Sequence, residues 1–124
     1  MTYRLAASVT ALVCVILFPI LLLATPSYMG TYGVASNAEA AFMSRRASPM
    51  LLGLGVLLWM SRRTTDGASI RAISAGVSVT FAGIAATGIY EFVSSVAHWY
   101  ILIAAVGELV IAAVFLRFVL LSRD

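Results

Sequence analysis

Apolar residues fill four long runs of the chain, and shorter polar stretches separate these runs. A helix of about 20 residues, rising ~1.5 Å per residue, crosses a hydrocarbon core about 30 Å thick. The pattern therefore predicts four membrane-spanning helices, at about residues 5–24, 37–61, 72–96 and 99–121. We expect an all-α, integral membrane four-helix bundle that forms a single transmembrane domain over residues 1–124.

The second span needs a separate argument, because its uninterrupted apolar run covers only residues 50–60. Eleven residues reach ~17 Å, which is too short to cross the membrane. Ser36 is followed three residues later by Glu39, a pattern typical of a helix amino terminus. We therefore expect the helix to begin at about residue 37 and to bend near Pro49.

Polar segments connect the predicted spans. Residues 26–35, rich in glycine, serine and tyrosine, are predicted to form a loop at the membrane surface. Residues 61–71, with several arginines, an aspartate and a glycine, are predicted to form a second loop. The link between the third and fourth spans is very short, so these two helices are expected to be antiparallel neighbours.

Composition supports a membrane protein. Hydrophobic residues make up 62% of the chain and charged residues 10%, with a mean hydropathy of +1.04, whereas roughly 25% of the residues of soluble domains are charged. The net charge is +3, but the arginines flank the apolar runs and form no patch, so no nucleic acid is expected as a partner.

The distribution of arginines predicts the orientation. One end of the predicted bundle carries Arg45 and Arg46, and the other carries Arg4, Arg62, Arg63, Arg71, Arg117 and Arg123. Arginine and lysine are enriched on the cytoplasmic side of membrane proteins. We therefore expect a multi-pass protein of a bacterial inner (cytoplasmic) membrane, with both termini in the cytoplasm.

Glu108 is the residue most indicative of function. It lies nine residues after Trp99 and nine before Arg117, or ~13 Å of helix from each, and so falls near the middle of the membrane. A carboxylate at that depth is costly unless it is protonated, paired or hydrated, and such residues often mark functional sites. The alternative is an interhelical hydrogen bond that only fixes packing.

A second carboxylate, Glu91, follows Tyr90 near the outer end of the third span. A stripe of small and polar residues leads up to it at steps of three and four: Gly76, Thr80, Gly83 and Thr87. This spacing predicts a packing face that ends in a polar pocket. Alternatively, Glu91 contacts water at the headgroup level.

Arg45 and Arg46 lie ~100° apart on a helix, so only one of them can point directly into the bundle. Arg46 shares a face with Phe42 and Gly53, and we expect it to point inward and to compensate a glutamate. The alternative is that both arginines bind lipid phosphates.

His98 is expected to lie at the interface, where it can titrate near neutral pH. The chain has one histidine and no metal-ligand spacing, so neither a metal nor a cofactor is expected.

The layout resembles the small four-helix bacterial membrane proteins of the DoxX-like group and neighbouring families of unknown function. The resemblance rests on a short first helix, an outer loop, the segment RRASPMLLGLG at residues 45–55, a basic hairpin and a closing helical pair. It covers most of the chain. It implies a four-helix membrane fold and a likeness to accessory subunits of membrane redox complexes, but no catalytic residue.

Three functions follow from these candidates. The first is a non-enzymatic accessory or ligand-binding subunit that encloses a cluster of Arg46, Glu91 and Glu108. The second is a proton-coupled transporter of a small or lipophilic solute, with Glu108 as the proton site. The third is a membrane-embedded isomerase or cyclase acting on a lipid-like substrate, with the two glutamates as acid and base. The expected partners are the lipid bilayer, a larger membrane complex or a lipophilic ligand, and a second copy of the chain.

Overall fold

The computed structural model describes residues 2–121, and this part of the chain is all-helical. Its helices are α1 (Tyr3–Leu23), α2 (Thr25–Thr31), α3 (Ala38–Ser61), α4 (Gly67–Val93) and α5 (Tyr100–Leu121). Three of them, α1, α4 and α5, are long and apolar enough to cross a membrane. The all-α prediction is confirmed, with five helices in the described residues where four were expected; Arg123 lies outside them.

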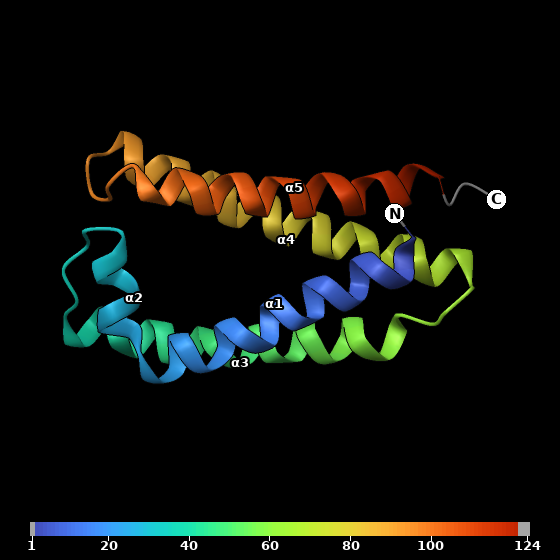
Figure 1. The fold of residues 1–124 in the computed structure, drawn as a ribbon, viewed down its shortest axis with the longest axis horizontal. Coiled ribbons are helices and arrows are strands. Elements are labelled where there is room, and N and C mark those ends of the chain that lie inside the picture. The colour runs from blue at the N-terminus through green and yellow to red at the C-terminus, as the bar shows by residue number, and fades with distance from the viewer. Residues whose placement is uncertain (1, 122–124) are drawn as a thin grey trace.

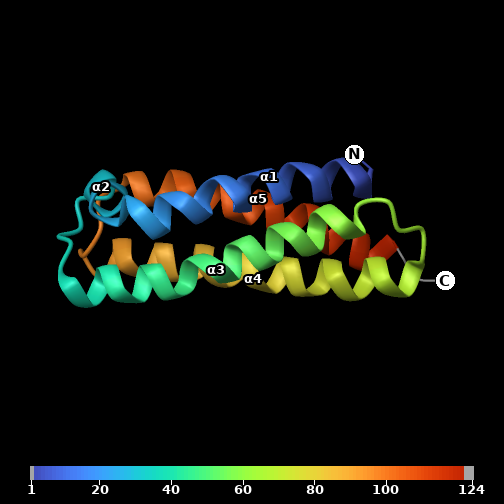
Figure 2. The ribbon, with the colours of Figure 1, turned by 90° about the horizontal axis from the view of Figure 1, so that it is seen from below.

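The four long helices form two antiparallel pairs, one of α1 with α3 and the other of α4 with α5. Figure 1 shows the pairs as two layers, with the short α2 standing at one end between them. The start of α1, the α3–α4 connection and the end of α5 lie together at the opposite end, which we call the terminal end. Seen from below in Figure 2, α1 lies over α5 and α3 lies over α4.

The two layers share a core near the terminal end, where α1 contacts α5. The ring of Tyr3 meets Phe115 and Phe118 edge-on, with ring centroids 6.4 and 5.6 Å apart. Its hydroxyl lies 3.2 Å from the Ser61 hydroxyl at the end of α3. Small residues of α1, with Leu58 and Phe81, complete this core. Tyr3 therefore contacts both layers.

The close approach of α1 to α3 depends on Gly55. A Cβ atom at this position would lie 3.1 Å from a Val15 methyl carbon and 3.2 Å from the carbonyl oxygen of Ala11. At the other end of the pair, the hydroxyl of Thr25 donates to the carbonyl oxygen of Leu21. The same hydroxyl lies 3.2 Å from the hydroxyl of Ser44. These contacts fix the register of α3 relative to α1.

The α4–α5 pair is fixed in the same way. The Ser78 hydroxyl donates to the carbonyl oxygen of Ala112 over 2.9 Å, and both residues are buried. A Cβ atom on Gly88 would lie 3.3 Å from Ile101 and 3.9 Å from Ala105. Such small residues let two helices in a membrane approach closely.

Two predicted loops contain helix. Residues 26–35 were expected to be irregular, but most of this stretch belongs to α2, which has Pro26 in its first turn. Proline suits that position because the first helical N–H groups have no partner within the helix. Residues 61–71 were also expected to be a loop, yet α4 begins at Gly67.

Aspartate and asparagine side chains explain where two helices begin. Asp66 accepts a hydrogen bond from the Ser69 N–H over 2.8 Å and so caps α4. Asn37 accepts one from the Ala40 N–H, also over 2.8 Å, and caps α3. The predicted cap at Ser36 was therefore wrong by one residue.

Candidate functional site

Glu108 lies on the face of α5 that packs against other helices. Its side chain is half-buried, and it is flanked by Ala105 and Ala112, both of which are buried. Glu108 is eight residues beyond the start of α5, or ~12 Å along the helix. Along the bundle, this carboxylate lies between the core at the terminal end and the short helix α2.

Tyr28 of α2 is half-buried, as Glu108 is. Burial is the main reason why the pKa of the Tyr28 phenol is raised, and the neighbouring Tyr32 phenol and the Glu108 carboxylate raise it further. The rings of Tyr28 and Tyr32 meet edge-on, with centroids 5.2 Å apart. Burial therefore favours the protonated form of the Tyr28 phenol.

Sequence reasoning assigned Tyr28 to a surface loop and so missed its relation to Glu108. The spacing of Tyr28 and Tyr32 by four residues, shortly after Pro26, was the available signal, because it places both rings on one face of a short helix. Spacing within this segment does not place that helix beside α5, which is distant along the chain.

The expected cluster of Arg46 with the two glutamates is not formed. Arg45 and Arg46 are both exposed, and the Arg46 guanidinium lies 5.6 Å from the centre of the Phe42 ring on its own helix. No ion pair joins either arginine to Glu91 or Glu108 within residues 2–121. The inward face of α3 carries small and apolar residues instead: Ser48, Gly55 and Leu58.

Glu91 and Glu108 are too far apart to act together on one group. In the antiparallel α4–α5 pair, Gly88 contacts Ile101, so Glu91 lies level with the start of α5. Glu108 lies about eight residues further along, a separation of ~12 Å along the helix axes. Tyr90 points outward and is 67% exposed. The polar pocket expected around these side chains is therefore not assembled.

The predicted packing stripe on α4 faces outward, so that prediction was wrong. Gly76, Thr80, Gly83 and Thr87 are exposed. The face in contact with other helices carries larger groups, including Val77 and Phe81, which fill the core between the layers. The two threonine hydroxyls donate to carbonyl oxygens of α4 itself, over 2.9 and 2.8 Å. These hydroxyls therefore need no partner from another helix.

The backbone of His98, and not its side chain, makes the hydrogen bond that joins two distant segments. Its side chain is exposed, and its N–H donates to the carbonyl oxygen of Tyr32 over 2.7 Å. Gly33, with a φ of +72°, passes beneath the imidazole, where a Cβ atom would lie 1.8 Å from Cδ2 of His98. The α4–α5 connection is thereby joined to the segment that follows α2.

Metal chemistry has no evident site in the described part of the chain, where no three histidine, cysteine or acidic side chains are grouped to hold an ion. The single cysteine, Cys14, is buried in the core.

Comparison with known proteins adds no relative, and the resemblance to the DoxX-like group stays a prediction from the layout. No family model, no curated protein and no solved structure matches this chain.

Proposed function

We propose that this chain is a four-span protein of a bacterial inner membrane, with both termini in the cytoplasm, that binds a small ligand at Glu108. The fourth span is α3, which packs along α1. The apolar part of α3 is short, so Arg45 and Arg46 extend from it toward lipid phosphates at the membrane surface. The excess of arginine at the terminal end supports the orientation.

The single observation that carries the proposal is the position of Glu108. A half-buried carboxylate halfway along a membrane-spanning helix is retained at a cost, which a bound partner offsets. An ionised carboxylate only accepts hydrogen bonds. The site therefore suits a ligand that brings a positive charge or N–H donors together with an apolar body.

A lipophilic cation, tetraphenylphosphonium, is a suitable first probe. We expect the purified protein in detergent to bind it, and Glu108→Gln to weaken binding at least tenfold. Glu91→Gln is the matched control, because it removes a carboxylate ~12 Å away and should leave the dissociation constant within twofold. Equal binding by the wild type and Glu108→Gln, or binding by neither, contradicts the proposal.

The arrangement of the two layers favours proton-coupled transport as a second candidate. The layers share a core near the terminal end, while at the other end α2 and the bond from His98 to Tyr32 join them. Rocking of one layer against the other about this core would expose Glu108 to the side of α2. Proteoliposomes should then show proton-linked uptake that Glu108→Gln abolishes. Absence of flux at any proton gradient excludes this candidate.

The accessory-subunit and enzyme hypotheses differ in their support. An accessory subunit should co-purify with a larger partner in mild detergent, and recovery of the chain as a free, stable particle argues against it.

An acid–base mechanism requires two groups within reach of one substrate, but Glu91 and Glu108 lie ~12 Å apart along the helix axes. Neither of the hollows between α1 and α3 and beside the α3–α4 connection is lined by a glutamate. We therefore do not propose an enzyme.

A further inference from the structure

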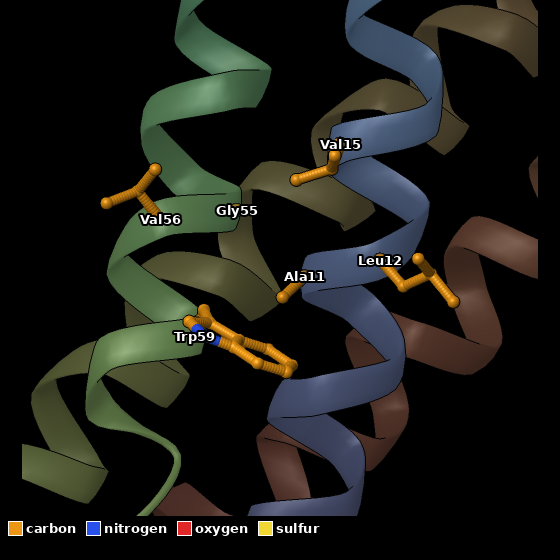
Figure 3. A pocket seen from close by; sticks show the side chains of 6 residues that line it. All are labelled: Ala11, Leu12, Val15, Gly55, Val56 and Trp59. Carbon is orange, nitrogen blue, oxygen red and sulfur yellow. The ribbon is translucent and has the colours of Figure 1, made fainter.

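A hollow of about 290 Å³ opens on the outer surface between α1 and α3 (Figure 3). It is lined only by apolar side chains and one glycine: Ala11, Leu12, Val15, Gly55, Val56 and Trp59. In Figure 3 the indole of Trp59 reaches from α3 toward α1 and closes the lower end of the hollow. We call this hollow the α1–α3 groove.

The α1–α3 groove faces away from the helix bundle. Leu12, Val56 and Trp59 are 60%, 48% and 53% exposed, so their outer surfaces would contact lipid in a membrane. Gly55 is buried and lines the groove at the point where α1 and α3 are in close contact, because a Cβ atom there would lie 3.1 Å from a Val15 methyl carbon. No other helix of the described chain covers this side.

A positive charge lies at the terminal end of the groove. The guanidinium of Arg62 stacks on the Trp59 ring, 3.6 Å from its centre, and donates a hydrogen bond to the Trp59 carbonyl oxygen. Arg4 adds a second guanidinium from α1. It precedes Ala11, another residue of the groove, by seven residues, which is close to two helical turns, and so lies on the same side of the helix.

The register of the two helices brings these arginines to one level. The hydroxyl of Tyr3 lies 3.2 Å from that of Ser61, and Arg4 and Arg62 are the next residues on each chain segment. Ala11 and Val15 lie ~10 and ~16 Å further along α1 than Arg4. The lining residues of the groove cover ~6 Å of each helix, and together with the arginines they extend over about half the thickness of a ~30 Å hydrocarbon core.

We propose that the α1–α3 groove binds one anionic phospholipid of the leaflet on the side of the chain termini. The lipid phosphate contacts the guanidinium groups of Arg4 and Arg62, which offer several N–H donors in planar geometry. An acyl chain lies along the groove against Gly55 and the indole of Trp59. The inference rests on the membrane placement proposed above and is independent of the ligand at Glu108.

Trp59 supplies a direct readout, because the chain has two tryptophans and Trp99 is at the other end of the bundle. In a Trp99→Phe background, the fluorescence of Trp59 is measured in bilayers of phosphatidylcholine with either brominated phosphatidylglycerol or brominated phosphatidylcholine. Bromine on an acyl chain quenches an indole that it touches. We expect half-maximal quenching at an at least fivefold lower mole fraction of the anionic lipid.

Two variants, each with a matched control, separate the contribution of the headgroup contacts from that of the acyl-chain contacts. Replacing Arg4 and Arg62 with glutamine should lower the preference for the anionic lipid about fivefold per arginine. Replacing Arg71 and Arg117, also exposed and toward the terminal end but on α4 and α5, should leave it unchanged. Val56→Phe should fill the groove and weaken quenching by both lipids, whereas Val79→Phe, on exposed α4 surface, should not.

The failures are distinguishable. Equal quenching by both brominated lipids overturns the inference and leaves the membrane placement intact. Loss of the preference on replacing Arg71 and Arg117 also overturns it, because the attraction would then be a general one to the charged end of the bundle. If neither lipid quenches Trp59, the membrane placement fails together with the lipid site.

Discussion

The backbone N–H of His98 donates a 2.7 Å hydrogen bond to the carbonyl oxygen of Tyr32 and so joins two segments 66 residues apart. Tyr32 follows α2, and His98 lies in the connection from α4 to α5. At the opposite end the two layers meet through Tyr3 and its aromatic neighbours. The bundle is therefore held at both ends by contacts between residues far apart in sequence.

Gly33→Ala should loosen the end that holds α2. Alanine is strained at a φ of +72°, and its Cβ atom would collide with the His98 imidazole, so the hydrogen bond to Tyr32 should break. We expect a loss of about 1–3 kcal/mol of stability. Gly30→Ala is the control, because its Cβ atom meets nothing within 4 Å. Thermal unfolding in detergent and hydrogen exchange at the His98 amide measure both effects. A Gly33→Ala protein as protected as the wild type contradicts the prediction.

Gly55→Ala should destabilise the α1–α3 pair. The added methyl group would press on Val15 and on the Ala11 carbonyl oxygen at 3.1–3.2 Å, and the backbone atom cannot turn aside. We expect a loss of about 1–3 kcal/mol. Gly53→Ala, two residues earlier in open space, should be neutral or slightly stabilising. The comparison requires only unfolding midpoints, and equal midpoints for the two variants would show that α1 and α3 are not in close contact.

Two serines of α4 should respond oppositely to replacement by alanine. The Ser78 hydroxyl bonds the Ala112 carbonyl oxygen, and its removal should cost about 0.6 kcal/mol, with an upper bound of about 1.7 kcal/mol. The Ser74 hydroxyl is fully buried and has no hydrogen-bond partner among residues 2–121, so Ser74→Ala should be neutral or stabilising. Unfolding free energies of both variants test this, and a larger loss for Ser74→Ala contradicts the assigned contacts.

The amino terminus of α4 should weaken in acid. The hydrogen bonds with Ser69 hold the pKa of Asp66 below its ordinary value of 3.8. Because the folded state binds this proton more weakly than the unfolded state, the contribution of Asp66 is complete above pH 3.8 and is lost as the pH falls through the lowered value. The melting temperature of the wild type should therefore fall in this range more steeply than that of Asp66→Asn, which keeps a capping side chain without a charge. Parallel curves for the two proteins contradict the role of Asp66.

Sequence patterns predicted the long helices well because the position of a long apolar helix depends on local properties of the chain. The length of an apolar run and the polar residues at its ends placed α1, α3, α4 and α5 within a few residues, apart from the start of α4. That start was missed because the residues after Ser61 were judged by polarity, although Asp66 and Gly67 also form a favourable cap.

Which face of a helix turns inward was much harder to predict. On α4, the stripe containing Gly76 and Gly83 suggested close packing, yet Phe81 and Val77 are the residues that fill the core. On α3, Arg46 was expected to compensate a glutamate, yet it lies over Phe42 on the outward face. In both cases the outcome depends on the neighbouring helix, which spacing within one segment does not reveal.

The contact of Tyr3 with Phe115 and Phe118 also bears on how the chain is made. A ribosome produces Tyr3 112 residues before Phe115 and 115 residues before Phe118. During synthesis α1 therefore lies beside its hairpin partner α3 with this aromatic ring unpaired, and the contact forms only after α5 has been made. A nascent chain halted before residue 100 should accordingly remain open to chaperones or proteases at its amino-terminal end.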